Sequence, residues 1–294
     1  MPIRFSVLAS GSRGNSALLR IDGTSLLIDV GLGPRVLTQR LESAGGCWNA
    51  LTGAVLTHTH RDHVCDATLR WLGRQGVRLY CHEAHRDEMA GRPGFETLHR
   101  SGLVRSFDES PFLAARGLWA EPIAVHHGGP TFGFRFEGRA QRRGQPVAIG
   151  YLTDTGSWSE RIADALADVD LLGIEFNHDE RMQRESGRSW PLIARNLGDH
   201  GHLSNDQGAA LLSAVLERSH AGAIREVVLL HLSQQCNRPE LALKAAREAI
   251  RTADRRAKVR AAGQASVLDA IPVRPGRRPV ALPDEGPSGF PWEL

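Results

Sequence analysis

The sequence has few cysteines and no long apolar run. Its four cysteines include no C-x-x-C pair, so we expect a protein of a reducing compartment with buried thiols. No apolar segment approaches the length of a membrane span, and residues 1–5 run directly into a strand pattern without the features of a signal peptide. The sequence therefore predicts a cytoplasmic protein with no membrane partner.

The chain also lacks a large excess of charge and any evident internal repeat. Its formal net charge is +3, which permits an anionic substrate but does not by itself indicate nucleic-acid binding. The apolar content of 41% is enough for a substantial core. Apolar residues become scarce near the end, where proline, glycine and arginine are frequent. We therefore divide the chain into one folded domain, residues 1–273, and a flexible tail, residues 274–294.

Periodicity and capping residues predict the local elements. Helices are expected at residues 34–41, 64–72, 83–89, 159–169, 204–218 and 239–256. Ser204 and Gln207 form a capping box at the start of one of them. Residues 91–120 show no clear pattern, and residues 138–144 are expected to form a solvated hairpin turn. We interpret His82, His85 and His99 as surface residues.

The loop at residues 10–16 is rich in glycine and serine, but it is not a P-loop. It lacks the G-K-[ST] ending, and no helix follows it. Small residues with free backbone N–H groups and hydroxyls favour an oxyanion site, to which Arg13 would add charge. A plain hairpin loop is an equally good interpretation of the same residues.

The densest group of chemically active side chains is the stretch H-T-H-R-D-H at residues 58–63, directly after an apolar, β-prone run. Imidazole and carboxylate groups are ligands for zinc and its first-row neighbours. His58 and His60 lie two residues apart on an extended backbone, so they point the same way and can share one ion. Asp62 and His63 follow on the turn, where they can bind a second ion. A histidine-rich surface turn is the less specific alternative.

Three further apolar strands end in a potential ligand, namely His126 or His127, Asp154 and His231. Layered α/β proteins gather their sites at the carboxyl ends of strands, so we expect these side chains to meet. The set is large enough for two metal ions: one held by His58, His60 and His127, the other by Asp62, His63 and His231, with Asp154 between them. Two such ions activate a water as nucleophile and neutralise charge on the attacked group, so the sequence predicts a hydrolase.

Seven motifs together resemble the metallo-β-lactamase fold, and within it the small YycJ/WalJ-type hydrolases, over about residues 3–272: LASGSRGNSALL, LLIDVG, LTHTHRDH, AIGYLTDTG, IEFNHD, GHLSN and LLHLSQQCNRPELAL. The resemblance implies an α/β protein with a four-layer αββα sandwich and the dinuclear site assigned above. It also implies phosphodiesterase or nuclease activity, with DNA exonuclease the function usually attached to this branch. Where the family usually has one histidine, this chain has His126 and His127, and alignment of the motif favours His127.

The resemblance also suggests which residues act on a phosphate. Glu175 and His202 are similar to a pair in nuclease members, in which a carboxylate orients a histidine beside the scissile phosphate. His202 would contact the phosphate or act as general acid; a capped helix start with an incidental histidine is the alternative. We count Asp62 as a further catalytic residue, and expect Asp29 to orient a ligand histidine. The candidate phosphate contacts are Ser10, Ser12, Arg13, Asn15, His178, His202 and Ser204.

The leading hypothesis is a metal-dependent phosphodiesterase, most simply an exonuclease, acting on a DNA or RNA strand. It is favoured by two anion sites, the loop at residues 10–16 and the helix start after His202. A thioester or lactone hydrolase of the same fold, and a small-molecule phosphodiesterase, are alternatives. A metal-stabilised binding module is disfavoured, because a structural zinc site closes with four ligands. We expect two divalent ions, Zn²⁺ first, although Mn²⁺ or iron suits the same ligands.

Overall fold

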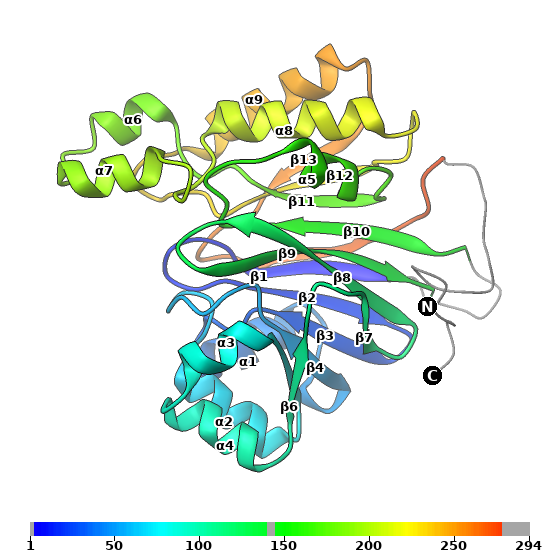
Figure 1. The fold of residues 1–294 in the computed structure, drawn as a ribbon. Helices are drawn as coiled ribbons and strands as arrows, with labels where there is room; N and C mark the ends of the chain where they lie inside the picture. Colours follow the sequence, from blue (N-terminus) through cyan, green and yellow to red (C-terminus); the bar gives the residue numbers. More distant parts are fainter. Residues whose placement is uncertain (1–2, 140–144, 278–294) are drawn as a thin grey trace.

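The computed structural model describes residues 3–139 and 145–277. Within these residues the strands form two seven-stranded sheets that pack face to face, with helices on both outer sides (Figure 1). These layers are the αββα sandwich that the sequence predicts, and the fold prediction is confirmed. The expected tail from residue 278 onward, and residues 140–144 of the expected hairpin turn, lie outside the described residues.

The strands of the first sheet are β1 (Arg4–Ala9), β2 (Ser16–Ile21), β3 (Thr24–Ile28), β4 (Leu51–Val55), β5 (Arg78–His82), β6 (Val104–Phe107) and β14 (Leu268–Pro272). They lie in the order β14-β1-β2-β3-β4-β5-β6. Strands β1 to β3 are antiparallel neighbours, whereas β3 to β6 run parallel. The carboxyl ends of β3 and β4 therefore lie at the same edge of this sheet.

The strands of the second sheet are β7 (Phe112–Ala115), β8 (Leu118–His126), β9 (Pro130–Gly138), β10 (Val147–Leu152), β11 (Leu171–Glu175), β12 (Glu226–Leu230) and β13 (Lys258–Ala261). They lie in the order β13-β12-β11-β10-β9-β8-β7. Strands β10 to β13 are parallel, and β8 and β10 are both antiparallel to β9. As a result, β8, β10, β11 and β12 all end at one edge of the sheet.

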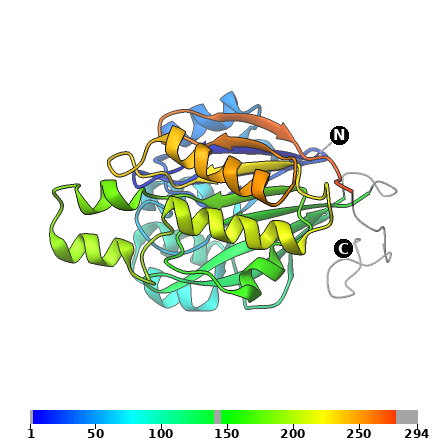
Figure 2. The same cartoon turned by 90° about the horizontal axis from the view of Figure 1, so that it is seen from above.

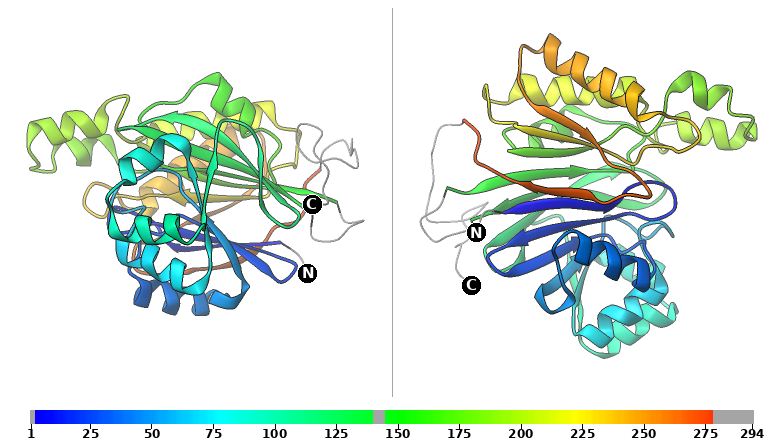
Figure 3. Two further views of the ribbon diagram at one scale, coloured as in Figure 1. Left: turned by 60° about the horizontal axis from the view of Figure 1, so that its bottom comes forward. Right: turned by 180° about the vertical axis from the view of Figure 1, so that it is seen from behind.

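The helices on the side of the first sheet are α1 (Pro34–Ser43), α2 (Asp66–Gln75), α3 (Glu83–Met89) and α4 (Pro93–Arg100). Those over the second sheet are α5 (Glu160–Ala165), α8 (Asn205–Arg218) and α9 (Pro239–Thr252). Two short helices, α6 (Glu180–Arg184) and α7 (Trp190–Leu197), project from one end of the sandwich in every view (Figures 1, 2 and 3). None of the helices in the described part of the chain has the length and apolar content that a membrane crossing requires.

Strand β10 shows how the sequence builds the layers. All six of its residues are buried, as expected for a central strand covered on both faces. Successive side chains point to opposite faces. Ile149 and Tyr151 therefore pack into the core between the two sheets, whereas Ala148 and Leu152 pack beneath the helices of the second sheet. Because both faces of β10 are buried, the strand ends where its apolar run gives way to polar residues. This end lies at the edge of the sandwich.

Several local predictions are confirmed. Helices α1 and α3 lie at the expected positions, and Ser204 and Gln207 form the expected capping box of α8. The helix expected at residues 239–256 ends at Thr252, and the missed strand β13 follows, a short edge strand with two charged residues. The prediction that His85 is a surface residue is wrong: its ring is fully buried, and its Nε2 lies 2.9 Å from the carbonyl oxygen of Pro130.

Candidate metal centre

The turn after β4 is fastened to two neighbouring segments. The backbone N–H of Asn15 donates to the carbonyl oxygen of Asp62 at 2.6 Å, and Val30 N–H donates to His63 at 2.9 Å. A Cβ atom on Gly31 would lie only 1.7 Å from the carbonyl oxygen of Asp62, so only glycine allows this approach. These contacts fix the direction in which residues 58–63 present their side chains.

Two of the other strand ends have strained backbones. Asp154, just beyond β10, and His231, just beyond β12, both have φ of 56°, in the left-handed region that non-glycine residues rarely adopt. Such conformations persist only where the surrounding structure enforces them, and they concentrate at functional sites. The bend turns both side chains toward the residues that follow β4.

The predicted ligand residues lie together in two groups. Within each group the candidate ligand atoms lie within 4.8 Å of one another. The first group is His58, His60 and His127, and the second is Asp62, His63, Asp154 and His231. Asp154 reaches both groups, because its Oδ1 lies 3.9 Å from His127 Nε2 and its Oδ2 lies 3.1 Å from His63 Nε2. Of the two adjacent histidines, His127 is buried in the cluster, whereas His126 is exposed and contacts Ser157.

Hydrogen bonds from outside the cluster orient three of the imidazoles. Asp29 Oδ2 lies 2.7 Å from His63 Nδ1, and the carbonyl oxygen of Gly201 lies 2.9 Å from His127 Nδ1. His231 Nδ1 lies 3.3 Å from Oε1 of Glu175, which can accept its proton. With Nδ1 engaged on the outer side, the Nε2 atom of each ring is directed at the cluster, the arrangement that metal-binding histidines have.

The donor set fits divalent metal ions. His58 Nε2 and His60 Nδ1 lie only 3.0 Å apart, so two ring nitrogens converge on one point. Burial opposes ionisation of Asp154, but His231 and His63 outweigh it and hold its pKa well below the usual value. Burial also opposes ionisation of His63, but Asp154 and Asp29 outweigh it and raise the pKa of His63 well above the usual value. A buried centre that attracts this much positive charge suits a cation of charge two.

Glu175 and His202 form a pair beside the second group. Glu175 is fully buried, its Oε2 accepts the N–H of Thr155 at 2.9 Å, and its Oε1 lies 2.9 Å from His202 Nδ1. Burial opposes its ionisation, but the charge and hydrogen bond of His202 and the hydrogen bond of His231 lower the pKa of Glu175 to about 2. Nε2 of His202 has no hydrogen-bond partner among the residues that the structure describes, and its side chain is 18% exposed.

The predicted phosphate contacts separate into buried and exposed residues. Ser10 is buried and its hydroxyl accepts the N–H of His231 at 2.7 Å, while Ser204 caps α8. Asn15 is also buried: its Oδ1 accepts from Gly11 N–H at 2.7 Å, and its Nδ2 lies 3.3 Å from Asp62 Oδ2. These buried side chains hold other residues of the site in place and do not face a ligand. Those that do reach the surface are Ser12, Arg13 and, in part, His202.

His178 is fully buried, so it does not line an open cleft. Its backbone pairs with Ser204, beside the start of α8. Neither ring nitrogen has a hydrogen-bond partner within the described ranges. Burial lowers the pKa of His178 to about 4, so the ring is neutral at physiological pH.

Two residues of the site are not among the residues that the sequence predicts. Thr57 Oγ1 donates to Asp29 Oδ2 at 2.9 Å and lies 3.0 Å from His58 Nδ1, which links the outer carboxylate to the cluster. Arg195 of α7 lies beside His60: a Cβ atom on Gly128 would lie 3.5 Å from both Arg195 Nη2 and His60 Nε2. Thr57 lies within the motif L-T-H-T-H-R-D-H, but the motif does not indicate its contact with Asp29. Arg195 belongs to no motif and comes near His60 through a contact between distant parts of the chain.

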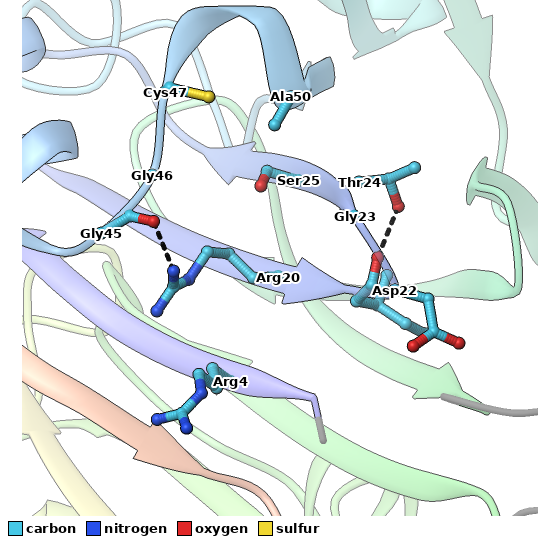
Figure 4. A pocket seen from close by; sticks show the side chains of 11 residues that line it. Arg4, Arg20, Asp22, Gly23, Thr24, Ser25, Gly45, Gly46, Cys47 and Ala50 are labelled. Carbon is cyan, nitrogen blue, oxygen red and sulfur yellow. Dashed lines mark hydrogen bonds between the residues drawn. The ribbon is translucent and has the colours of Figure 1, made fainter. Parts of the chain in front are cut away.

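A separate cavity of about 170 Å³ lies at the opposite end of β1 and β2 (Figure 4). Arg4 and Arg20 line it, and they are cross-strand partners, while Arg20 Nη1 donates to the carbonyl oxygen of Gly45. Since β1 begins at Arg4 and runs toward Ser10, which contacts His231, this cavity is remote from the metal cluster. It contains none of the predicted site residues.

The sandwich and its edge cluster of histidines and carboxylates define a metallo-β-lactamase type of protein. Residues 24–232 match the family described as beta-lactamase superfamily domain, and the chain belongs to this superfamily. Membership and the two clusters together imply a site for divalent metal ions. The metallo-beta-lactamase fold protein YhfI from Bacillus subtilis superposes with a TM-score of 0.66 at 17% identity, covering 91% of this chain and 99% of that chain.

Within the superfamily the chain is a relative of two named bacterial proteins. It is 30% identical to exodeoxyribonuclease WalJ of Streptococcus pneumoniae over 247 residues, which cover 81% of this chain and 85% of that protein. It is 28% identical to exodeoxyribonuclease YycJ of Bacillus anthracis over 245 residues, which cover 82% of this chain and 87% of that protein. The resemblance seen in the sequence motifs is therefore confirmed.

Proposed function

We propose that this protein is a dinuclear metal-dependent phosphodiesterase that shortens DNA from an end. The observation that carries the proposal is the meeting of seven ligand residues from four strand ends with the Glu175–His202 pair beside them. The names of the two relatives, both exodeoxyribonucleases, support DNA as the substrate class. The location in the cytoplasm and the division into a domain of residues 1–273 and a tail stay predictions.

The first ion would be held by His58, His60 and His127, and the second by Asp62, His63 and His231, with Asp154 shared. Zinc is our proposal for both positions, because imidazole nitrogen predominates among the ligands. When bound, two divalent ions supply Lewis acidity and lower the pKa of water, which is the chemistry that phosphodiester hydrolysis needs.

The protein's own contribution to the reaction is a proton donor. His202 Nδ1 faces Glu175, so its Nε2 is left to meet the substrate. Because the pKa of Glu175 is about 2, the carboxylate is ionised at neutral pH and accepts the Nδ1 proton of His202, which fixes the orientation of the ring. We assign His202 as the general acid that gives its Nε2 proton to the leaving oxygen, and Glu175 as the residue that positions it.

A direct test is hydrolysis of 5′-phosphorylated and 5′-hydroxyl DNA and RNA oligonucleotides by protein of defined metal content, with Asp154→Ala as control. Stepwise shortening of DNA that requires Asp154 is the expected result, and the preferred end shows the polarity. If no strand is cleaved while the metals are bound, the proposal fails, and a small phosphodiester or a thioester becomes the substrate to test.

A further inference from the structure

The chain between Glu175 and His202 leaves the sandwich, forms α6 and α7, and returns to the metal centre (Figures 1 and 2). Its return is firmly attached. His202 N–H donates to the carbonyl oxygen of Asn196 at 3.1 Å, and the carbonyl oxygen of Gly201 lies 2.9 Å from His127 Nδ1. Helix α7 is therefore fixed in place relative to the residues that would perform the reaction.

Helix α7 exposes an unusual amount of apolar surface. Trp190 is 68% exposed and Leu192 is 40% exposed, whereas the other large exposed apolar residues of the described chain, Val36 and Leu241, are 39% and 36% exposed. No ring contact of Trp190 with another described residue occurs. An exposed indole on a helix next to an active site is typical of a surface that binds a planar partner.

The same helix carries a positive charge that forms no ion pair with any residue in the described ranges. On α6, Arg181 pairs with Glu185 and Arg184 with Glu180. Arg195 of α7, by contrast, has no ion pair within the part of the chain that the structure describes. Its guanidinium lies near His60, because a Cβ atom on Gly128 would lie 3.5 Å from both Arg195 Nη2 and His60 Nε2. The charge of Arg195 therefore lies close to a residue of the metal cluster.

We propose that α7 binds the nucleic-acid strand as it enters the site: Trp190 stacks on a base, and Arg195 contacts a phosphate between that base and the scissile bond. The inference rests on the proposed function. Aromatic stacking is the usual way to hold a single strand without reading its sequence, and unpaired arginine is the usual phosphate contact. Five residues of α-helix span about 7.5 Å, which matches roughly two nucleotide steps of a stacked strand.

The test compares cleavage of a single-stranded oligonucleotide by the wild type and by Trp190→Ala, Trp190→Phe and Arg195→Ala. Trp190→Ala should raise KM about 5- to 50-fold, and phenylalanine should restore most of the loss. Arg195→Ala should make binding less sensitive to salt, lowering the slope of log affinity against log salt concentration by about one. The matched controls are Arg184→Ala, an exposed arginine with an ion pair on α6, and Leu241→Ala, an exposed apolar residue on α9.

A strand with abasic sites beyond the scissile bond separates stacking from a structural effect. On this strand the wild type and Trp190→Ala should have the same KM, because no base is left to stack. An unchanged KM of Trp190→Ala on the intact strand would overturn the inference while leaving the proposed function in place. If the wild type cleaves no strand, the proposed function fails. The binding role of α7 is then tested by the Kd for the strand, measured by fluorescence anisotropy. Equal Kd values for the wild type and Trp190→Ala would contradict the inference.

Discussion

Nδ1 of His202 lies 2.9 Å from Oε1 of Glu175, and the other oxygen of Glu175 is held at 2.9 Å by the backbone N–H of Thr155. The carboxylate therefore cannot turn away from the imidazole without losing a buried hydrogen bond. This contact fixes which nitrogen of His202 is free.

The first prediction concerns His202. His202→Ala should lower kcat about 10²- to 10³-fold, the range that a general acid contributes, with both metals retained. Glu175→Gln should give a smaller loss, because the amide oxygen still accepts from Nδ1 but carries no negative charge. Kinetics on a DNA oligonucleotide and metal analysis by mass spectrometry check both. Loss of a metal from His202→Ala would show that this residue is a ligand after all.

Asp154 should behave differently. Asp154→Ala removes a buried carboxylate that contacts both ligand groups, so turnover and metal occupancy should be lost together. Metal content and DNA hydrolysis are measured on the same samples. The matched control is Glu217→Gln, which removes an exposed carboxylate from α8. An Asp154→Ala protein that retains two metals and its activity would contradict the dinuclear assignment.

The sequence predicted the candidate ligands because their signal is local. An apolar strand that ends in a histidine or a carboxylate is visible in a few residues, as at Leu152 before Asp154, and parallel strands bring such ends to one edge. The same reasoning found the start of α8, since a capping box is also local. The αββα layers were implied by the resemblance of the motifs to a known family.

Contacts between distant segments were not predictable in this way. His85 lies in a polar helix, yet its ring packs edge-on against Phe132 of the other sheet, and this contact leaves no trace in the neighbouring residues. Arg195 reaches His60 only because α7 returns to the site. For the loop at residues 10–16, the sequence indicated polar residue types but not the direction in which their side chains point. Asn15 turns inward to Asp62.

Asn15 gives the third prediction. Because its side chain holds the backbone and carboxylate of Asp62, Asn15→Ala should weaken metal affinity about 10- to 100-fold, as loss of an outer hydrogen bond does at other metal sites. The KM for DNA at saturating metal should change little. Metal titration and steady-state kinetics separate the two effects, with Ser12→Ala, an exposed change in the same loop, as control. A raised KM with unchanged metal affinity would instead make Asn15 a phosphate contact.

The thiols provide a fourth prediction. The sequence suggested buried cysteines, and Cys81 and Cys236 are buried, but Cys47 is exposed. Burial raises the pKa of Cys81 to about 12, so almost no thiolate forms there at pH 8. Iodoacetamide should therefore modify Cys47 rapidly and Cys81 only after unfolding, as followed by peptide mass spectrometry. Equal rates at the two positions in the native protein would show that the strand carrying Cys81 opens readily.

His178 makes stability depend on pH. Burial lowers its pKa from 6.5 to about 4 in the folded protein, so below pH 6.5 the unfolded chain binds a proton that the native state does not. Protons then favour unfolding, and the free energy of unfolding should fall as the pH drops from 6.5 toward 4. At pH 5 this one group lowers the free energy of unfolding by about 2 kcal/mol relative to pH 7.

Replacing the ring removes that dependence. His178→Leu should therefore gain stability relative to the wild type as the pH is lowered, by about 2 kcal/mol at pH 5. Urea denaturation at pH 7, 6 and 5, with a chelator present so that metal release does not contribute, measures the difference. His178→Phe retains an aromatic ring of similar size and separates the proton effect from a change in packing. If the stability difference between wild type and both variants is the same at every pH, His178 is not the buried neutral imidazole that its surroundings require, because only a group that titrates differently in the two states can change the slope.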